Sequence, residues 1–349
     1  MDILKIFAPT TVAFIIGILI TPIISGFLYK HQMWKKKSVA VATDGEVATI
    51  SQKLHNDEER KTPRMGGVVI WASAIITIFL FWLISMFDGP TLSKLNFLSR
   101  NQTWLPIFTL IIGALVGLVD DYFSVTERYD QKAGGLSSNK RLLAIFIISL
   151  IGAWWFYAKL EMTDIIIPFW GIWHANLLFI LFFIIVMLGT YSGGVIDGLD
   201  GLSGGVFSII FSAYGLIAYF QNQLDLSAFC FVLVGGLLAF LWFNIPPARF
   251  YMSETGTMAL TITLVVIAFL TKQVLVLPII AFPLVISSGS SIIQLLSKRF
   301  WHKKVFLVAP LHHHFQALGW PAYKVVMRYW VIGMIFASIG IIVALLGLK

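Results

Sequence analysis

Acidic residues and cysteine are scarce in this chain of 349 residues. It contains 17 Asp and Glu and a single cysteine, Cys230, and only 12% of its residues are charged while 58% are hydrophobic. Because Cys230 stands alone inside an apolar stretch, an intramolecular disulfide is excluded. The mean hydropathy of +0.87 excludes an ordinary soluble domain and indicates a polytopic membrane protein.

Ten apolar stretches are long enough to cross a membrane, which takes about 20 mostly apolar residues in a helix. We therefore expect an all-α fold with about ten transmembrane helices, forming a single domain over residues 1–349. No secretory cleavage pattern is evident, so the first stretch is expected to remain as a span. The predicted spans are 7–29, 66–87, 104–121, 140–157, 173–192, 202–220, 226–243, 256–271, 274–296 and 326–347.

Basic residues predict the orientation of the chain. If the N-terminus lies outside, most of the 25 Lys and Arg fall on one side, which the positive-inside rule makes cytoplasmic. Both termini then lie outside. The net charge of +8 fits anionic lipid headgroups, and no soluble basic domain exists to bind nucleic acid. The predicted cytoplasmic loops are 30-65, 122-139, 193-201, 244-255 and 297-325.

The few acids gather on that predicted cytoplasmic side. Asp120 and Asp121 end the third span in the string GLVDDYFS. Adjacent carboxylates repel each other unless a cation or a proton relieves them. Mg²⁺ prefers oxygen ligands and is commonly held by one or two carboxylates together with substrate phosphates. The pair therefore indicates a metal site, with an ordinary solvated helix end as the alternative.

The string GVIDGLDGLSGG at 194–205 is the most specific local pattern. Asp197 and Asp200 are three residues apart, so they are neighbours on one face if the segment is helical. The surrounding glycines leave the backbone open to close approach by a ligand. Close helix packing in lipid is the alternative, but packing alone does not require two aspartates.

Two further polar segments lie on the same side. In FNIPPARFYMSETG at 243–256, Glu254 is a candidate site residue, although Ser253 or Glu254 could instead cap the next helix. Tyr251 offers an aromatic face, with an interfacial belt position as the alternative. The string APLHHHF at 309–315 carries three contiguous histidines. Their spacing suits hydrogen bonding to phosphate better than convergence on zinc, and a polar loop without a function is the alternative.

Five motifs, in order from residue 62 to residue 315, resemble one known family. They are TPRMGG, VDDY, DGLDGLSGG, FNIPPARFYMSETG and KKVFLVAPLHHHF. The chain resembles the phospho-N-acetylmuramoyl-pentapeptide transferases (MraY), one branch of the polyprenyl-phosphate N-acetylhexosamine-1-phosphate transferase superfamily. The histidine motif favours this branch over the other sugar-phosphate branches.

The resemblance implies a reaction in which UDP-N-acetylmuramoyl-pentapeptide and undecaprenyl phosphate give lipid I and UMP with Mg²⁺. It implies a location in the bacterial plasma (inner) membrane, with the active site on the cytoplasmic face. The expected partners are both substrates and membrane lipid. A homodimer is a candidate assembly. By match to the motifs, the implied catalytic residues are Asp120, Asp121, Glu254, His312, His313 and His314. Of these, Glu254, Asp120 and Asp121 are the implied metal ligands. The implied substrate-binding residues are Lys140, Asp197, Asp200, Asn244 and Tyr251.

Four positions depart from the family pattern. Tyr191 and Gly194 stand where the family usually has asparagine, Glu254 where it has aspartate, and Ser124 where it has the lysine of DDxxK. These departures keep two alternatives open, namely a catalytically weakened relative and a UDP-N-acetylglucosamine-1-phosphate transferase of the same superfamily. A transporter would instead place its ionisable residues near the bilayer midplane.

The predicted topology can be tested with reporter fusions. Fusions after Lys37, Lys132 and Lys303 are expected to report a cytoplasmic position, and fusions near Lys94 and Lys159 an external one, because basic loops are retained on the cytoplasmic side. Alkaline phosphatase and fluorescent-protein reporters distinguish the two sides. A cytoplasmic signal at Lys94 would contradict the span count and divide the acidic clusters between the two faces.

Overall fold

The computed structural model describes residues 2–34, 61–87, 93–99, 102–126 and 135–347. Most of the predicted loop 30-65 and part of the loop 122-139 lie outside these residues. The longer helices are α1 (Asp2–Lys30), α3 (Val68–Ile84), α4 (Trp104–Thr126), α5 (Ser138–Ala158), α6 (Leu178–Ser192), α7 (Leu202–Phe220), α8 (Leu224–Asn244), α9 (Ser253–Leu270), α11 (Phe282–Trp301) and α13 (Ala322–Leu346). The shorter ones are η2 (Ser93–Leu95), η3 (Gly193–Ile196), η4 (Val274–Val276), α10 (Leu277–Ile280) and α12 (Leu311–Ala317).

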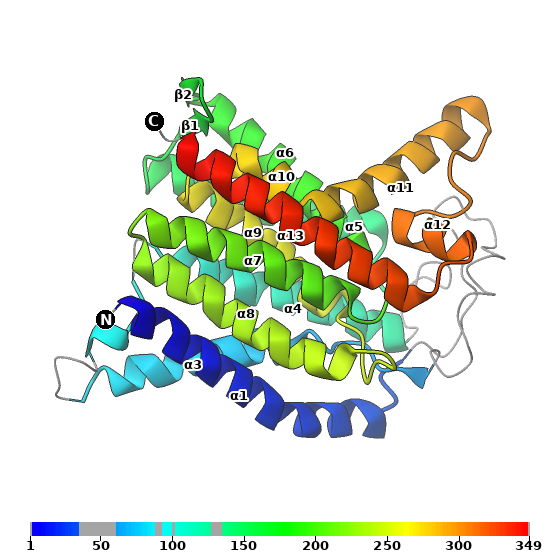
Figure 1. The fold of residues 1–349 in the computed structure, drawn as a ribbon, viewed down its shortest axis with the longest axis horizontal. Coiled ribbons are helices and arrows are strands. Elements are labelled where there is room, and N and C mark those ends of the chain that lie inside the picture. The colour runs from blue at the N-terminus through cyan, green and yellow to red at the C-terminus, as the bar shows by residue number, and fades with distance from the viewer. Residues whose placement is uncertain (1, 35–60, 88–92, 100–101, 127–134, 348–349) are drawn as a thin grey trace.

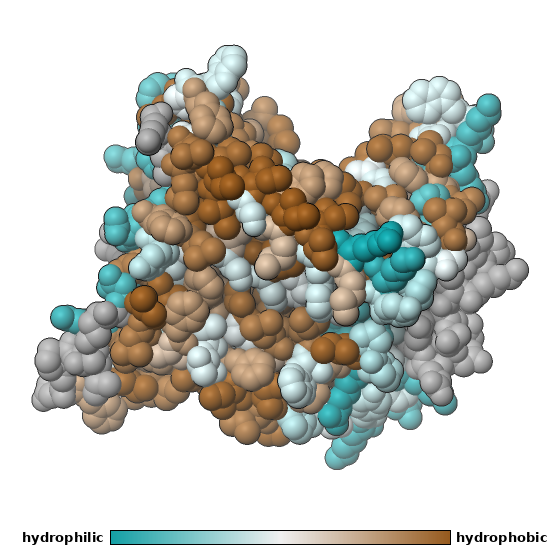
Figure 2. Space-filling model, in the orientation of Figure 1, coloured by the Kyte–Doolittle hydropathy of each residue, from teal (hydrophilic) through white to brown (hydrophobic). Residues whose placement is uncertain are grey.

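The predicted all-α membrane fold is confirmed. In the described part of the chain, eight helices are long and apolar enough to cross a membrane, and a bent pair of helices makes up to nine. The shorter apolar helix α3 corresponds to the remaining predicted stretch. Both chain ends lie at one end of the helical bundle, and α12 lies toward the other (Figure 1). Apolar side chains cover much of the middle of the face shown in Figure 2.

The stretch predicted as one straight span at 274–296 has a different shape. The segment Val274–Ile280 and the helix α11 meet at an angle of 82°. The break falls at Ala281, and Pro283 follows within the first turn of α11, where proline is compatible with a new helix but not with the continuation of an old one. As a result, α11 projects away from the bundle (Figure 1).

A small β-hairpin was not predicted from the sequence. Strands β1 (Asp164–Ile167) and β2 (Gly171–His174) pair in antiparallel register, with Asp164 opposite His174. The predicted span 173–192 therefore starts too early, because its first residues belong to β2 and α6 begins at Leu178. The hairpin lies at the end of the bundle that carries both chain ends (Figure 1).

Helix α9 forms the centre of the bundle. Nearly all of its side chains are buried, and it packs against α3, α4 and α6. A helix that is apolar around its whole circumference has no preferred lipid face and is stable only inside a protein or a membrane. The outer helices α1, α5 and α13 instead leave many large apolar side chains exposed, as expected for contact with lipid.

Close contact between α4 and α9 positions the acidic residues. A Cβ atom at Gly113 would lie 2.9 Å from the Cα atom of Ala259, and one at Gly117 would collide with the carbonyl oxygen of Glu254. The backbones of the two helices therefore touch at these glycines, as small residues allow in membrane bundles. Gly117 is one turn before Asp120 and Asp121, so the start of α9 lies directly beside both acids.

This contact gives a stability prediction. Gly117→Ala is expected to lower the melting temperature of the detergent-solubilised protein by several degrees, because overpacking against a backbone costs about 1–3 kcal/mol or more. The matched control is Gly189→Ala in α6, where an added Cβ would meet nothing within 4 Å. Equal melting temperatures for the two variants would show that the helices can separate without cost.

Candidate active site

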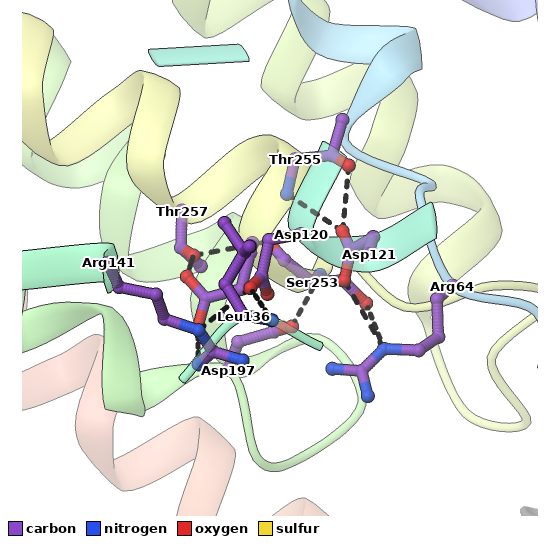
Figure 3. A network of polar contacts seen from close by, with 10 residues as sticks. Arg64, Asp120, Asp121, Leu136, Arg141, Asp197, Ser253, Thr255 and Thr257 are labelled. Carbon is purple, nitrogen blue, oxygen red and sulfur yellow. Dashed lines mark hydrogen bonds and ion pairs between the residues drawn. The ribbon is translucent and has the colours of Figure 1, made fainter. Parts of the chain in front are cut away.

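Two buried aspartates hold the N-terminus of α9. Asp121 Oδ2 accepts hydrogen bonds from the backbone N of Thr255 at 2.9 Å and from its hydroxyl at 2.7 Å. Asp197 Oδ2 accepts one from the backbone N of Ser253 at 2.7 Å (Figure 3). The first N–H groups of a helix have no partner within the helix, and negative charge is favoured there. The two aspartates therefore cap α9 from α4 and from the segment after η3.

The second oxygen of Asp121 is buried and accepts no hydrogen bond from the described residues. Arg64 Nε lies 3.5 Å from it but donates its hydrogen bond to Ser253 Oγ at 3.1 Å. Arg64 thus neutralises the charge of Asp121 without satisfying this oxygen (Figure 3). A buried carboxylate oxygen with an open lone pair is available to a further ligand.

Arg141 joins two further carboxylates. Its Nε donates to Asp120 Oδ1 at 2.8 Å, and its Nη1 donates to Glu254 Oε1 at 3.1 Å. The backbone N of Leu136 also donates to Asp120 Oδ1 at 2.8 Å. Gly135 has a φ of +104°, which favours glycine, and a Cβ there would lie 3.0 Å from Arg141. The segment at Gly135 and Leu136 and the start of α5 therefore pack tightly around the Arg141–Asp120 ion pair.

The capping alternative for Glu254 and Ser253 is wrong. The N-cap position of α9 is Met252, and no side chain there caps the helix. Glu254 instead directs its carboxylate to Arg141 and accepts a long hydrogen bond, 3.3 Å, from the Thr257 hydroxyl. Among the described residues, no group of three His, Cys, Asp or Glu is arranged to hold a metal ion.

Asp200 and Asn244 hold the neighbouring loops together. Asp200 Oδ2 accepts a hydrogen bond from the backbone N of Ala248 at 2.9 Å. Asn244 accepts one from the backbone N of Gly201 at 2.9 Å and donates one to the Phe250 carbonyl at 2.8 Å. The amide of Asn244 is thus engaged by backbone on both sides, while a substrate-binding role for either residue stays a prediction.

The histidines lie against the segment that carries Asp197. A Cβ atom at Gly198 would collide with His312 Nε2 and lie 2.8 Å from His313 Nε2. His312 is fully buried, and neither of its ring nitrogens has a hydrogen-bond partner among the described residues. Burial, reinforced by the adjacent His313, lowers the pKa of His312 well below its usual range, so this imidazole is neutral near pH 7.

The other two histidines have protein partners. His313 Nδ1 lies 2.8 Å from Gln316 Oε1, and His314 Nδ1 accepts a hydrogen bond from the backbone N of Leu307 at 3.2 Å. Only His312 and His313 therefore face the glycine-rich segment. His314 is turned toward its own loop, which separates its environment from that of the other two.

Arg141, which was not named from the sequence, reaches Asp120 and Glu254. The neighbouring Lys140 is exposed at the start of α5, and its substrate-binding role stays a prediction. Arg64, in the motif TPRMGG, was also not named as a site residue, although it lies beside Asp121. Its position within a motif was a usable signal. Tyr251 contributes backbone contacts to Pro63 and Gly66, and its stacking role stays a prediction.

Comparison with known proteins identifies the family. Residues 103–272 match the family described as Glycosyl transferase family 4. A phospho-N-acetylmuramoyl-pentapeptide-transferase of Listeria monocytogenes is 33% identical over 352 residues, covering 99% of this chain and 100% of the relative. The chain belongs to this transferase family. Relatives of the same name from Anoxybacillus flavithermus and Levilactobacillus brevis are 33% and 32% identical, covering 94% and 86% of this chain and 94% and 90% of their own length.

Departures from the family pattern cluster around Arg141 and Glu254. Tyr191 lies near both Arg141 and Glu254. A Cβ at Gly194 would contact the Thr257 side chain at 3.4 Å, and Thr257 in turn donates to Glu254. Three of the four departures therefore lie in one neighbourhood, while the fourth, Ser124, is buried in α4 and its hydroxyl has no hydrogen-bond partner among the described residues.

The cap formed by Asp197 gives a prediction for pH dependence. Burial raises the pKa of Asp197, while hydrogen bonds from Ser203 and Ser253 oppose the rise. The Ser203 hydroxyl donates to Asp197 Oδ1 at 2.7 Å and stabilises the ionised form. This stabilisation is present above the folded-state pKa of Asp197 and is lost as the pH falls through it.

Ser203→Ala should therefore cost about 1–3 kcal/mol of unfolding free energy at a pH above the folded-state pKa of Asp197 and clearly less at a pH below it. The matched control is Ser208→Ala in the same helix, because the Ser208 hydroxyl donates to the uncharged Gly204 carbonyl. Thermal unfolding in detergent at the two pH values measures the difference. The same loss at both would show that the Ser203 bond does not depend on the charge of Asp197.

Proposed function

We propose that this chain transfers phospho-N-acetylmuramoyl-pentapeptide from its UDP-linked donor to undecaprenyl phosphate, giving lipid I and UMP. The observation that carries the proposal is the full-length similarity to transferases of that name. Family membership makes the chain a phospho-sugar transferase, and its apolar helices make it a multi-pass membrane protein. The proposed location is the bacterial plasma membrane, with the acidic site on the cytoplasmic face.

The side chains of the site suit phosphoryl transfer. This reaction depends mainly on positioning and on the neutralisation of developing charge. Arg64 and Arg141 place two fixed positive charges among the acids. The ring nitrogens of buried His312 have no hydrogen-bond partner among the described residues and provide a hydrogen-bonding group for a phosphate oxygen. The glycine at position 198 lets this ring pack directly against the backbone.

The donor set suits the expected Mg²⁺ in its chemistry, although these side chains are not arranged around a common metal position among the described residues. Asp120, Asp121 and Glu254 supply carboxylate oxygens, the ligands that Mg²⁺ prefers, and one buried oxygen of Asp121 accepts no hydrogen bond from the described residues. We propose these three residues as the metal-binding set. When bound, the ion would neutralise charge on the phosphates of the donor. The homodimer stays a prediction.

Radiolabel transfer to undecaprenyl phosphate tests the function. The purified protein is expected to use UDP-N-acetylmuramoyl-pentapeptide and not UDP-N-acetylglucosamine, and to need Mg²⁺. Asp120→Asn and Glu254→Gln should insert normally but lose most transfer, since they keep shape and remove charge. Asp164→Asn in the hairpin is the matched control and should keep full activity. Transfer from UDP-N-acetylglucosamine instead would favour the other branch of the superfamily.

The longer acid at position 254 gives a further prediction. Glu254→Asp should lower transfer by roughly tenfold, about 1.4 kcal/mol in the barrier, because a shorter side chain would move the carboxylate away from Arg141 and Thr257. Adding Gly194→Asn should recover part of the loss, since position 194 contacts Thr257. Rates of the two single variants and the double variant measure the coupling. Faster transfer in Glu254→Asp alone would mark this chain as a weakened relative.

A further inference from the structure

Arg141 occupies the space between two carboxylates of the proposed metal-binding set. Its guanidinium bridges Asp120 of α4 and Glu254 of α9, at 2.8 and 3.1 Å. We propose that Arg141 is a displaceable counter-ion, which competes with the divalent cation for these carboxylates and leaves Glu254 when the cation binds. This inference rests on the proposed function only in taking the site to bind a divalent cation.

The helices cannot relieve this competition by moving apart. The backbones of α4 and α9 are in contact at Gly117 and Glu254, so the starting points of both carboxylates are fixed. A divalent cation that takes the same oxygens would lie within a few ångströms of the guanidinium. At that distance, and with water partly excluded, the repulsion between the two cations is far larger than thermal energy. A cation that takes Asp120 Oδ1 and Glu254 Oε1 therefore competes directly with the guanidinium that now occupies these two oxygens.

Hydrogen bonding at Asp120 supports the same conclusion. Asp120 Oδ1 already accepts from Arg141 Nε and from the backbone N of Leu136. A carboxylate oxygen has two lone pairs in its plane, so this oxygen has none free for a metal while Arg141 stays. The backbone donor is fixed by its loop, which leaves the Arg141 side chain as the partner that can withdraw.

The Arg141 side chain has room to move toward the open side of the site. This side chain is 23% exposed, whereas that of Asp120 is 1% exposed, so it borders the open side of the site. Tyr191 lies near both Arg141 and Glu254, which gives the guanidinium a neighbour beside the site once it leaves the carboxylates. Arg64 differs, because its Nε is held by Ser253 Oγ and, among the described residues, its ion pair is with Asp121, outside the pair that Arg141 bridges.

Mn²⁺ binding to the purified full-length protein, without substrate, tests the proposal. The question is whether substitution of Arg141 strengthens or weakens this binding. Electron paramagnetic resonance gives the Kd for Mn²⁺. Removing a competitor strengthens binding, so Arg141→Gln should bind Mn²⁺ about tenfold more tightly or better. The matched control is Arg299→Gln, which makes the same substitution at an exposed position of α11 and should change the Kd by less than about twofold. Unchanged or weaker binding in Arg141→Gln would overturn the proposal.

A second measurement uses the unaltered protein and does not depend on the variant folding. The rate of phenylglyoxal modification of Arg141, followed by peptide mass spectrometry, should rise severalfold when Mn²⁺ is added. A rate that stays the same or falls would show that Arg141 remains between the carboxylates. If the protein and both variants bind no Mn²⁺ and transfer continues in EDTA, the metal in the proposed function fails, and the competition fails with it.

Discussion

The N-terminus of α9 is the constraint on which the rest of the site depends. Its first N–H groups are buried and need acceptors, and the carboxylates of Asp121 and Asp197 are buried and need donors. Each group would be costly alone in a low-dielectric interior, and pairing them removes both costs. Because the two aspartates come from α4 and from the segment before α7, this pairing fixes three distant parts of the chain around one helix end.

Within a single aspartate of this site, one oxygen can support the fold while the other is left for the candidate chemistry. Asp121 uses one oxygen to cap α9, and its other oxygen is buried beside Arg64 and accepts no hydrogen bond from the described part of the chain. Asp120 likewise gives one oxygen to Leu136 and Arg141. A change at either acid therefore alters the scaffold and the candidate chemistry together. Glu254 differs, since its backbone supports the contact with α4 while its whole carboxylate faces the site.

Sequence reasoning located the acids and nearly all helices because both depend on local composition. The helix 202–220 was predicted with the bounds that the structure has, and the polar clusters were placed on one side. The 82° bend was missed, since the segments on either side of Ala281 together are apolar enough for one span. Arg141 was missed because adjacent helical residues point about 100° apart, so the sequence alone does not show that Arg141 faces the acids. Only packing against a neighbour, here α4, decides which of them faces inward.

Three of the departures from the family pattern make physical sense as one set. The backbone of Glu254 cannot retreat, because its carbonyl contacts Gly117 of α4. The extra methylene of glutamate must therefore be accommodated by the side chain, which extends to Arg141 on one side and Thr257 on the other. Tyr191 lies near Arg141 and Glu254, and Gly194 adds no side chain next to Thr257. The neighbours of Glu254 thus leave its longer side chain the room and the partners it needs, which favours a site that has adapted around this acid.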